Sequence, residues 1–433
     1  LAMSAFCYFV TIPTSALYIN HFLNDTRTSG LLIATFEYSA GVLQPLQTLV
    51  LAATGKEDSW LGLNVVYIIM CLLSSIGCIL YTLALPLNSL AVVFVGRAFS
   101  GVSAGNQLFS TQISRTTIDY KKTHQIDETQ EQENAQEHLM FAQATRYEIL
   151  AYTMGGSTAL VVAAIFGTFM TKRFDVDVNV ATAPTIVAAV IPLLLIVAAL
   201  VYFRNTVVGA GESRGLSKKA LDKADTVEHS LVEKAGHSSG SAVDAWIGIA
   251  GVLLTSTNEG LRHVTSFELS HIRWGWDLQY ASLFASAMFF LPAFLLPFDH
   301  SWYKAAGPMP SSILYSLFIL LAAPWMWDAT FGSIMFTIAS LFYGFFGRII
   351  YTQYFVLVYH YISSTRDGPK HPLVYVACLS IGQSFGLAIG ATIATLFDLS
   401  VYTFVAVAAM QIVSGGVLMW RTRAARDVPH LSR

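Results

Sequence analysis

Charged side chains inside long apolar runs are the residues of this sequence that could do chemistry. Glu259 is followed by Arg262 and His263, three and four residues later, so on a helix both could pair with its carboxylate. Glu37 and Arg97 lie in two other apolar runs. A charge inside a bilayer is costly unless it is paired or used. These residues are therefore candidates for exchanging a proton or for binding an anion.

Further polar and aromatic residues of the apolar runs complete the candidate set for solute binding and coupling. The set contains Glu37, Arg97, Asn106, Asn258, Glu259, Arg262, His263, Arg348, Tyr351 and Tyr354. No metal site and no cofactor are expected, because the four cysteines lie in apolar runs without Cys-x-x-Cys spacing.

Long apolar stretches, about twelve in number, must position these side chains. A stretch of about 20 residues crosses the hydrocarbon core as a helix. Hydrophobic residues make up 54% of the sequence and charged residues 12%, which is too little charge to cover a soluble protein of this size. The sequence therefore predicts an all-α membrane protein with twelve transmembrane helices, over residues 3–22, 30–53, 61–84, 89–112, 146–170, 181–204, 245–268, 277–298, 311–327, 331–362, 372–397 and 399–420.

One polar segment divides these stretches into two sets of six. Residues 1–204 are expected to form an N-terminal six-helix bundle, 205–244 a cytoplasmic linker, and 245–433 a C-terminal six-helix bundle. Two bundles that rock about a central site give alternating access, as in secondary transporters. Lys and Arg in the short loops predict that both termini and the linker face the cytoplasm. The Asn-x-Thr acceptor at Asn24 then lies on the opposite side, where it could carry a glycan.

A motif in the fourth stretch carries a first family resemblance. It reads GRAFSGVSAGN over residues 96–106 and resembles the fourth-helix pattern of the major facilitator superfamily. Arg97, Gly101 and Gly105 recur every four residues, so they share one helix face, and the resemblance implies a membrane-embedded arginine that orders a proton relay or an anionic substrate. The alternative is an arginine that reaches the membrane surface from the helix end. A packing face is also expected from the glycines of the eleventh stretch, Gly382, Gly386 and Gly390.

A second stretch narrows the resemblance to one branch of the superfamily. It reads LLTSTNEG over residues 253–260, followed by VTSF and by a Trp-Gly-Trp element at 274–276. It is similar to the seventh-helix region of plant vacuolar phosphate transporters and of lysosomal major facilitator proteins of the ceroid-lipofuscinosis type. The branch implies a vacuolar or lysosomal membrane, with the plasma membrane as an alternative.

Three departures from the family pattern stand beside these matches. The loop after the second stretch is reduced to AATGKE over residues 52–57, which puts its conformational latch in doubt. The fifth stretch keeps two glycines, at 155 and 156, without the proline of the family motif, so proton antiport cannot be carried over. Residues 107–109 replace the arginine pair of a phosphate carrier, which weakens the expectation of phosphate as substrate.

Taken together, these features predict a secondary active transporter. We expect it to move a small solute, an organic or inorganic anion, by alternating access, with protons as the candidate coupling ion. Its partners would be the solute and the lipid bilayer, with no nucleic acid, and a monomer is expected. The alternative is a channel or a transporter-derived receptor or scaffold without alternating access. An enzyme is not expected, because the sequence has no recognisable nucleophile, metal or nucleotide-binding motif.

Overall fold

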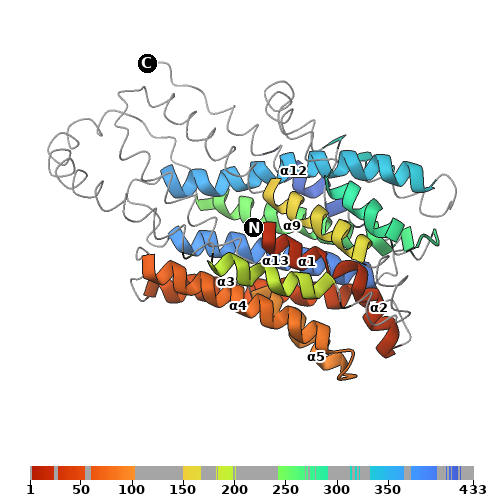
Figure 1. Cartoon of the computed structure of the whole chain (residues 1–433). Helices are drawn as coiled ribbons and strands as arrows, with labels where there is room; N and C mark the ends of the chain where they lie inside the picture. Colours follow the sequence, from red (N-terminus) through yellow and green to blue (C-terminus); the bar gives the residue numbers. More distant parts are fainter. Residues whose placement is uncertain are drawn as a thin grey trace, which may run out of the picture.

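Long helices that run side by side make up the described part of the chain (Figure 1). The computed structural model describes residues 2–23, 28–53, 60–102, 150–166, 182, 184–197, 200, 242–268, 270–271, 274–277, 279–290, 313–314, 317–318, 321, 332–364, 372–396, 406, 409–410, 412–417 and 420.

The first apolar stretch forms two helices where the sequence predicts one. Helix α1 is Ala2–Phe9 and helix α2 is Ile12–Leu23. The break has a local cause in Pro13, which has no N–H and cannot donate to the carbonyl of Phe9 four residues earlier. The proline instead lies in the first turn of α2, where a missing N–H costs nothing.

Three helices follow α2 in the N-terminal half. They are α3 (Ser29–Ala53), α4 (Trp60–Leu83) and α5 (Leu90–Val102). A tight turn joins α4 to α5 and places Asn88 at a φ of 46°, a left-handed conformation that Asn tolerates better than most residues. Helices 150–166 and 184–197 complete the described N-terminal half.

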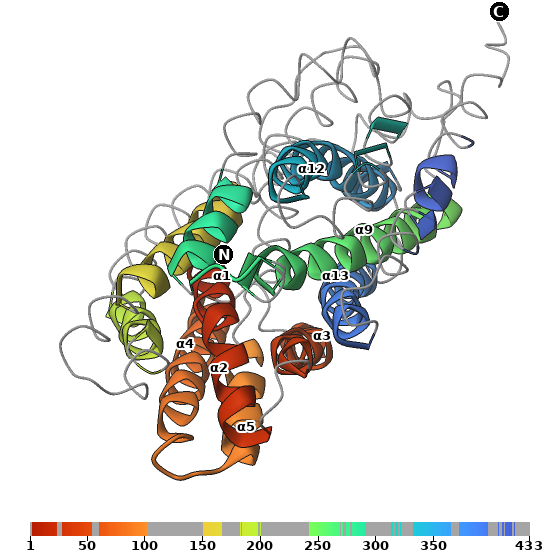
Figure 2. The same cartoon turned by 90° about the vertical axis from the view of Figure 1, so that its right-hand side faces the viewer.

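The C-terminal half is built around α9 (Ala242–Glu268), α12 (Gly332–Ser364) and α13 (Pro372–Leu396), with a further helix at 279–290. Helix α9 lies between α12 and α13 (Figure 2). The glycines of α13 explain how closely it approaches α9, because a methyl group on Gly386 would lie 2.5 Å from the Leu253 carbonyl oxygen. A methyl group on Gly390 would likewise meet the backbone of α9, at Thr257 and Leu261.

Among the described residues, two helix pairs with hydrogen bonds across them are part of the contact between the two halves of the chain. Helices α3 and α13 lie side by side (Figure 2), and the hydroxyls of Tyr38 and Thr392 are hydrogen-bonded at 3.2 Å. Helices 150–166 and 279–290 share a reciprocal pair of bonds. The Ser157 hydroxyl donates to the Ser286 carbonyl at 3.3 Å, and the Ser286 hydroxyl donates to the Ser157 carbonyl at 3.0 Å.

The helices have the length and apolarity needed to cross a membrane. Within the part of the chain that the structure describes, three segments pass on both criteria, Val65–Leu83, Ser333–Phe355 and Val374–Leu396, and four shorter apolar helices accompany them. Large apolar side chains such as Leu194 and Val197 are more than 60% exposed, as expected for surfaces that face lipid rather than water. The chain is an integral, multi-pass membrane protein. The count of twelve spans stays a prediction, because much of 103–149 and 291–331 lies outside the described residues.

Candidate functional site

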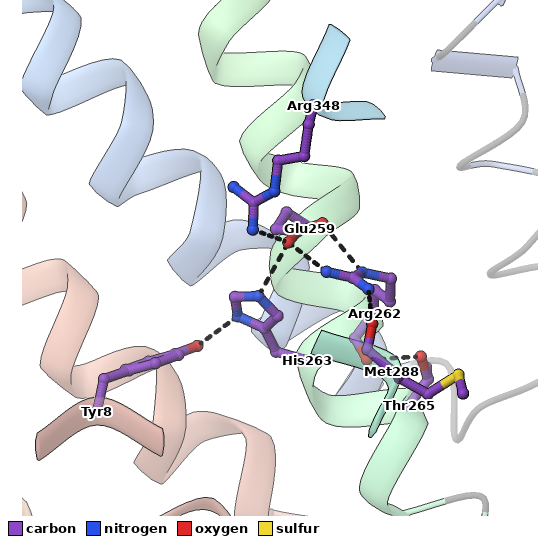
Figure 3. Close-up of polar contacts among 7 residues, drawn as sticks. All are labelled: Tyr8, Glu259, Arg262, His263, Thr265, Met288 and Arg348. Atoms are coloured by element: carbon purple, nitrogen blue, oxygen red, sulfur yellow. Dashed lines mark hydrogen bonds and ion pairs between the residues drawn. The ribbon is translucent and has the colours of Figure 1, made fainter. Parts of the chain in front are cut away.

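One carboxylate, that of Glu259 on α9, joins three basic side chains inside the helix bundle (Figure 3). Arg262 donates from Nε to Oε2 at 3.0 Å and from Nη2 to Oε1. Arg348 of α12 donates from Nη2 to Oε1 at 2.7 Å, and His263 Nε2 lies 3.3 Å from the same oxygen. Oxygen Oε1 therefore accepts from three residues, whereas Oε2 accepts from Arg262.

Arg262 is the firmly anchored arginine of this cluster. Besides its two bonds to Glu259, it donates from Nη1 to the Met288 carbonyl at 3.2 Å. Its guanidinium lies 4.6 Å from the ring centroid of Phe289 and 5.6 Å from that of Tyr343. The side chain is 5% exposed. These contacts tie α9 to the helix 279–290 and make Arg262 a fixed part of the scaffold.

Arg348 is held less tightly. Its side chain is 15% exposed, and Glu259 supplies the one side-chain hydrogen bond that it makes among the described residues. Its guanidinium carbon also lies 5.7 Å from the ring centroid of Tyr152, on helix 150–166 of the other half of the chain. Arg348 thus connects the C-terminal carboxylate with an N-terminal aromatic ring.

His263 links the cluster to the first helix. Its Nδ1 lies 3.4 Å from the Tyr8 hydroxyl on α1, and its ring is fully buried (Figure 3). Because the Glu259 carboxylate can only accept, the neutral imidazole carries its proton on Nε2 and accepts from Tyr8 on Nδ1. Phe9, Phe289 and Tyr152 enclose the ring, with centroid distances of 4.8, 4.8 and 6.4 Å.

Arg97 lies on α5 and is 1% exposed, so the surrounding helices cover its side chain. It donates from Nη1 to the Cys7 carbonyl at 3.3 Å, while its Nε and Nη2 have no hydrogen-bond partner within the described part of the chain. The guanidinium lies 4.8 Å from the ring centroid of Phe36 and 5.9 Å from that of Tyr8. A buried cation with two unused donors is a place where an anion or water is stabilised.

Two more predicted residues have buried polar groups. Glu37 on α3 is 5% exposed and interacts with Arg97 and with the Ser384 hydroxyl of α13. Asn258 is fully buried, and neither polar atom of its amide has a hydrogen-bond partner in the described ranges. Glu37 therefore lies at the contact between α3 and α13, and Asn258 offers an unused donor and acceptor beside Glu259 in the chain.

The remaining predicted residues have other surroundings. Tyr354 packs against Gly251 of α9, and its hydroxyl lies 2.6 Å from the Ser414 hydroxyl. Tyr351 packs against the ring of Phe355 at 4.7 Å. Gly101 lies against the backbone of α3 at Phe36. Asn24, Gly105 and Asn106 lie outside the described residues.

Tyr8 and Tyr152 are the site residues that sequence reasoning missed. Each lies in an apolar stretch, where a tyrosine looks like an ordinary packing residue; Tyr8 has no charged neighbour at helical spacing, and Tyr152 has Glu148 four residues before it. Tyr8 becomes notable only because the fold brings its hydroxyl to His263, 255 residues away. A signal for either residue would have required knowledge of which helices touch.

The charges of the cluster do not balance. Arg262 and Arg348 bring two positive charges to the single negative charge of Glu259, and His263 is neutral in the hydrogen-bonding pattern above. An uncompensated positive charge in a medium of low dielectric constant attracts an anion strongly. Among the described residues, no group of three or more His, Cys, Asp or Glu could hold a metal ion.

Known structures share this fold at low sequence identity. No protein-family model matches the sequence, and no curated protein matches it. The xylose transporter XylE from E. coli is 12% identical with a TM-score of 0.61, and the match covers 99% of this chain and 95% of that one. A variant of the nucleoside transporter NupG is 14% identical with a TM-score of 0.57, covering 96% and 98%. The peptide transporter POT in complex with sulfate is 11% identical with a TM-score of 0.58, covering 98% and 93%.

These matches define the class of fold. The described residues are helical apart from short turns, and the chain matches the fold of major facilitator transporters over nearly its whole length. The three neighbours are transporters and not enzymes. Identities this low relate the folds and leave the solute open.

Proposed function

We propose that this protein is a secondary active transporter that moves a small anionic solute across a membrane by alternating access. The observation that carries the proposal is the charge excess at Glu259. Two membrane-embedded arginines share one carboxylate, and they do so where side chains from both halves of the chain meet. In this fold the solute site lies between the two halves, near the middle of the bilayer. An anion bound there would balance the excess positive charge.

Protons are the proposed coupling ion. Glu259 faces Arg262 and His263 on its own helix and Arg348 from α12, and His263 in turn faces Tyr8 of α1. Protonation would remove the one negative charge that holds these groups together. The loss of that charge would favour one arrangement of the two halves over the other, which is how a single proton can drive a conformational change.

Structural neighbours and sequence resemblance support the finer details. One neighbour was solved in complex with sulfate and another, a POT family transporter, in complex with 5-aminolevulinic acid, so this fold accommodates ligands with anionic groups. The seventh-helix resemblance favours a vacuolar or lysosomal membrane, and a monomer suffices because both halves belong to one chain.

Solute uptake into proteoliposomes with an imposed pH gradient tests the proposal. The purified chain would be screened with phosphate, organic anions, amino acids and sugars. We expect concentrative uptake of an anion that collapses with the gradient and is accelerated by the same solute on the opposite side. Flux of that anion that neither saturates nor shows this acceleration would instead indicate a channel, and no flux of any solute would favour a receptor.

A further inference from the structure

We propose that Arg348 and the Tyr152 hydroxyl form the binding site for the carboxylate of an organic monocarboxylate, and that Glu259 occupies Arg348 when no substrate is bound. This inference rests on the proposed function and specifies its substrate class. The two residues come from opposite halves of the chain, so a ligand held by both would touch both halves.

Arg348 is the arginine of the cluster that can change partners. Arg262 has a third bond, to the Met288 carbonyl, and packs against Phe289, so releasing it would disrupt the contact between α9 and helix 279–290. If Arg348 changed partners, it would lose one hydrogen bond to Glu259 and would keep its cation–π contact with the Tyr152 ring. It is also the more exposed of the two, at 15% against 5%.

Tyr152 supplies an unused polar group beside this arginine. Its hydroxyl is buried and has no hydrogen-bond partner among the residues that the structure describes. Such orphaned groups are uncommon in folded proteins and call for an explanation. A ligand oxygen that accepts from Arg348 and from the Tyr152 hydroxyl would satisfy the orphan and would gain a charge-assisted bond.

The group that now binds Arg348 indicates which ligand fits. Glu259 presents a carboxylate oxygen to Nη2 at 2.7 Å, a normal length for a charged hydrogen bond. A substrate carboxylate in that place would leave Arg262 paired with Glu259 and Arg348 paired with the substrate. The cluster would then be neutral, so a monovalent anion matches it better than phosphate, which carries more than one charge near neutral pH.

Ligand-dependent thermal stabilisation of the purified full chain tests this inference. The probes are acetate, lactate and benzoate, each paired with its amide, with succinate and inorganic phosphate as divalent comparisons. We expect at least one monocarboxylate to stabilise the protein, with its amide and the divalent anions without effect at the same concentration. Stabilisation by phosphate alone, or equal stabilisation by acid and amide, would overturn the site.

Three variants separate binding from scaffolding. Glu259→Gln should bind the monocarboxylate about tenfold more tightly, because the competing internal carboxylate is gone. Arg348→Gln should lose binding, and Tyr152→Phe should weaken it about tenfold. Tyr280→Phe is the matched control, since Tyr280 is 62% exposed and should bind normally. Each variant would be compared only if it elutes as a monodisperse species.

Other outcomes of the same binding measurements would contradict the proposed site. Weaker binding by Glu259→Gln would mean that Glu259 builds the site rather than occupying it, and unchanged binding by Tyr152→Phe would remove the tyrosine. If Arg348→Gln fails to fold, the binding results for Glu259→Gln and Tyr152→Phe still test the proposed carboxylate site. Concentrative uptake of phosphate or of a dicarboxylate, without any binding of a monocarboxylate, would refute the monocarboxylate site but leave the proposed anion transporter intact.

Discussion

At the scale of single residues, the two arginine environments differ in how their charge is balanced. Arg262 has a bidentate carboxylate partner, whereas Arg97 is as deeply buried and makes one hydrogen bond, to a backbone carbonyl. Among the described residues Arg97 interacts with the Glu37 carboxyl without a hydrogen bond to it, and a buried charge that is not hydrogen-bonded to an acid costs stability. A buried cation that carries such a cost is a candidate for function rather than for packing.

Arg97→Met tests this view of Arg97. Methionine has a comparable reach and is apolar, so it should fill the space between Phe36 and Tyr8 without a buried charge. We expect thermal stability to be unchanged or higher and transport to fall by about tenfold or more, since a lost charged hydrogen bond is worth about 1.5–3 kcal/mol. Melting temperature and proteoliposome uptake would be measured on the same preparation. Full transport by this variant would show that the cation is dispensable.

Glu259→Gln tests the proton-coupling role at the neighbouring cluster. Glutamine resembles the protonated acid at nearly constant volume and cannot give up a proton, so uptake should no longer respond to an imposed pH gradient while substrate binding persists. Uptake would be measured with and without the gradient. Asp277→Asn is the control, because this carboxylate lies in the loop after α9 and should leave the gradient dependence intact. A gradient response as large as that of the unmodified protein would remove Glu259 from the coupling mechanism.

At the scale of helices, the sequence predicts the elements well and their contacts poorly. The expected and observed ends of α3, α4, α9, α12 and α13 agree within a few residues, because hydropathy registers membrane thickness. The break between α1 and α2 was not predicted, since one proline matters less to average hydropathy than to hydrogen bonding.

The same limit applies to the candidate site. Arg262 and His263 could be placed beside Glu259 because helical spacing alone brings them together. Arg348 is 89 residues from Glu259, and Tyr8 is 255 residues from His263, so their positions depend on which helices touch. Hydropathy contains no information on that question, and buried tyrosines in apolar helices look like ordinary packing residues.

Gly386→Val tests the contact between α9 and α13. Side-chain carbon at this position would meet the Leu253 carbonyl oxygen at 2.5 Å and the Ser256 side chain at 2.6 Å, and valine is branched where it is most crowded. We expect a lower melting temperature, from overpacking that costs about 1–3 kcal/mol. Gly416→Val is a suitable control, because a side-chain carbon there would meet no atom within 4 Å. Equal melting temperatures for the two variants would contradict the close contact.

At the scale of the whole molecule, the described contacts between the halves include one at an end of α3 and α13. Gly30 lies near the first residue of α3, and Thr395 lies near the last residue of α13. A side-chain carbon on Gly30 would lie 3.4 Å from the Thr395 Cβ. The two halves are therefore closed on each other at this end, which a transporter must open once in each cycle.

The double variant Gly30→Cys/Thr395→Cys tests whether that opening occurs. The Cβ separation of 3.4 Å is near the range of about 3.5–4.5 Å found in disulfides. The new side-chain carbon would also lie 2.6 Å from the Ala391 carbonyl oxygen, so oxidation should link the halves once α13 shifts away from α3 enough to relieve that contact. The variant would be made with Cys7, Cys71, Cys78 and Cys378 replaced by serine or alanine, and the two single variants serve as controls. If transport requires this end to open, oxidation should stop uptake and reduction should restore it, while the single variants stay active. If the fully cross-linked protein transported solute as fast as the chemically reduced protein, the halves would not need to separate at this end. That result would favour a channel over alternating access.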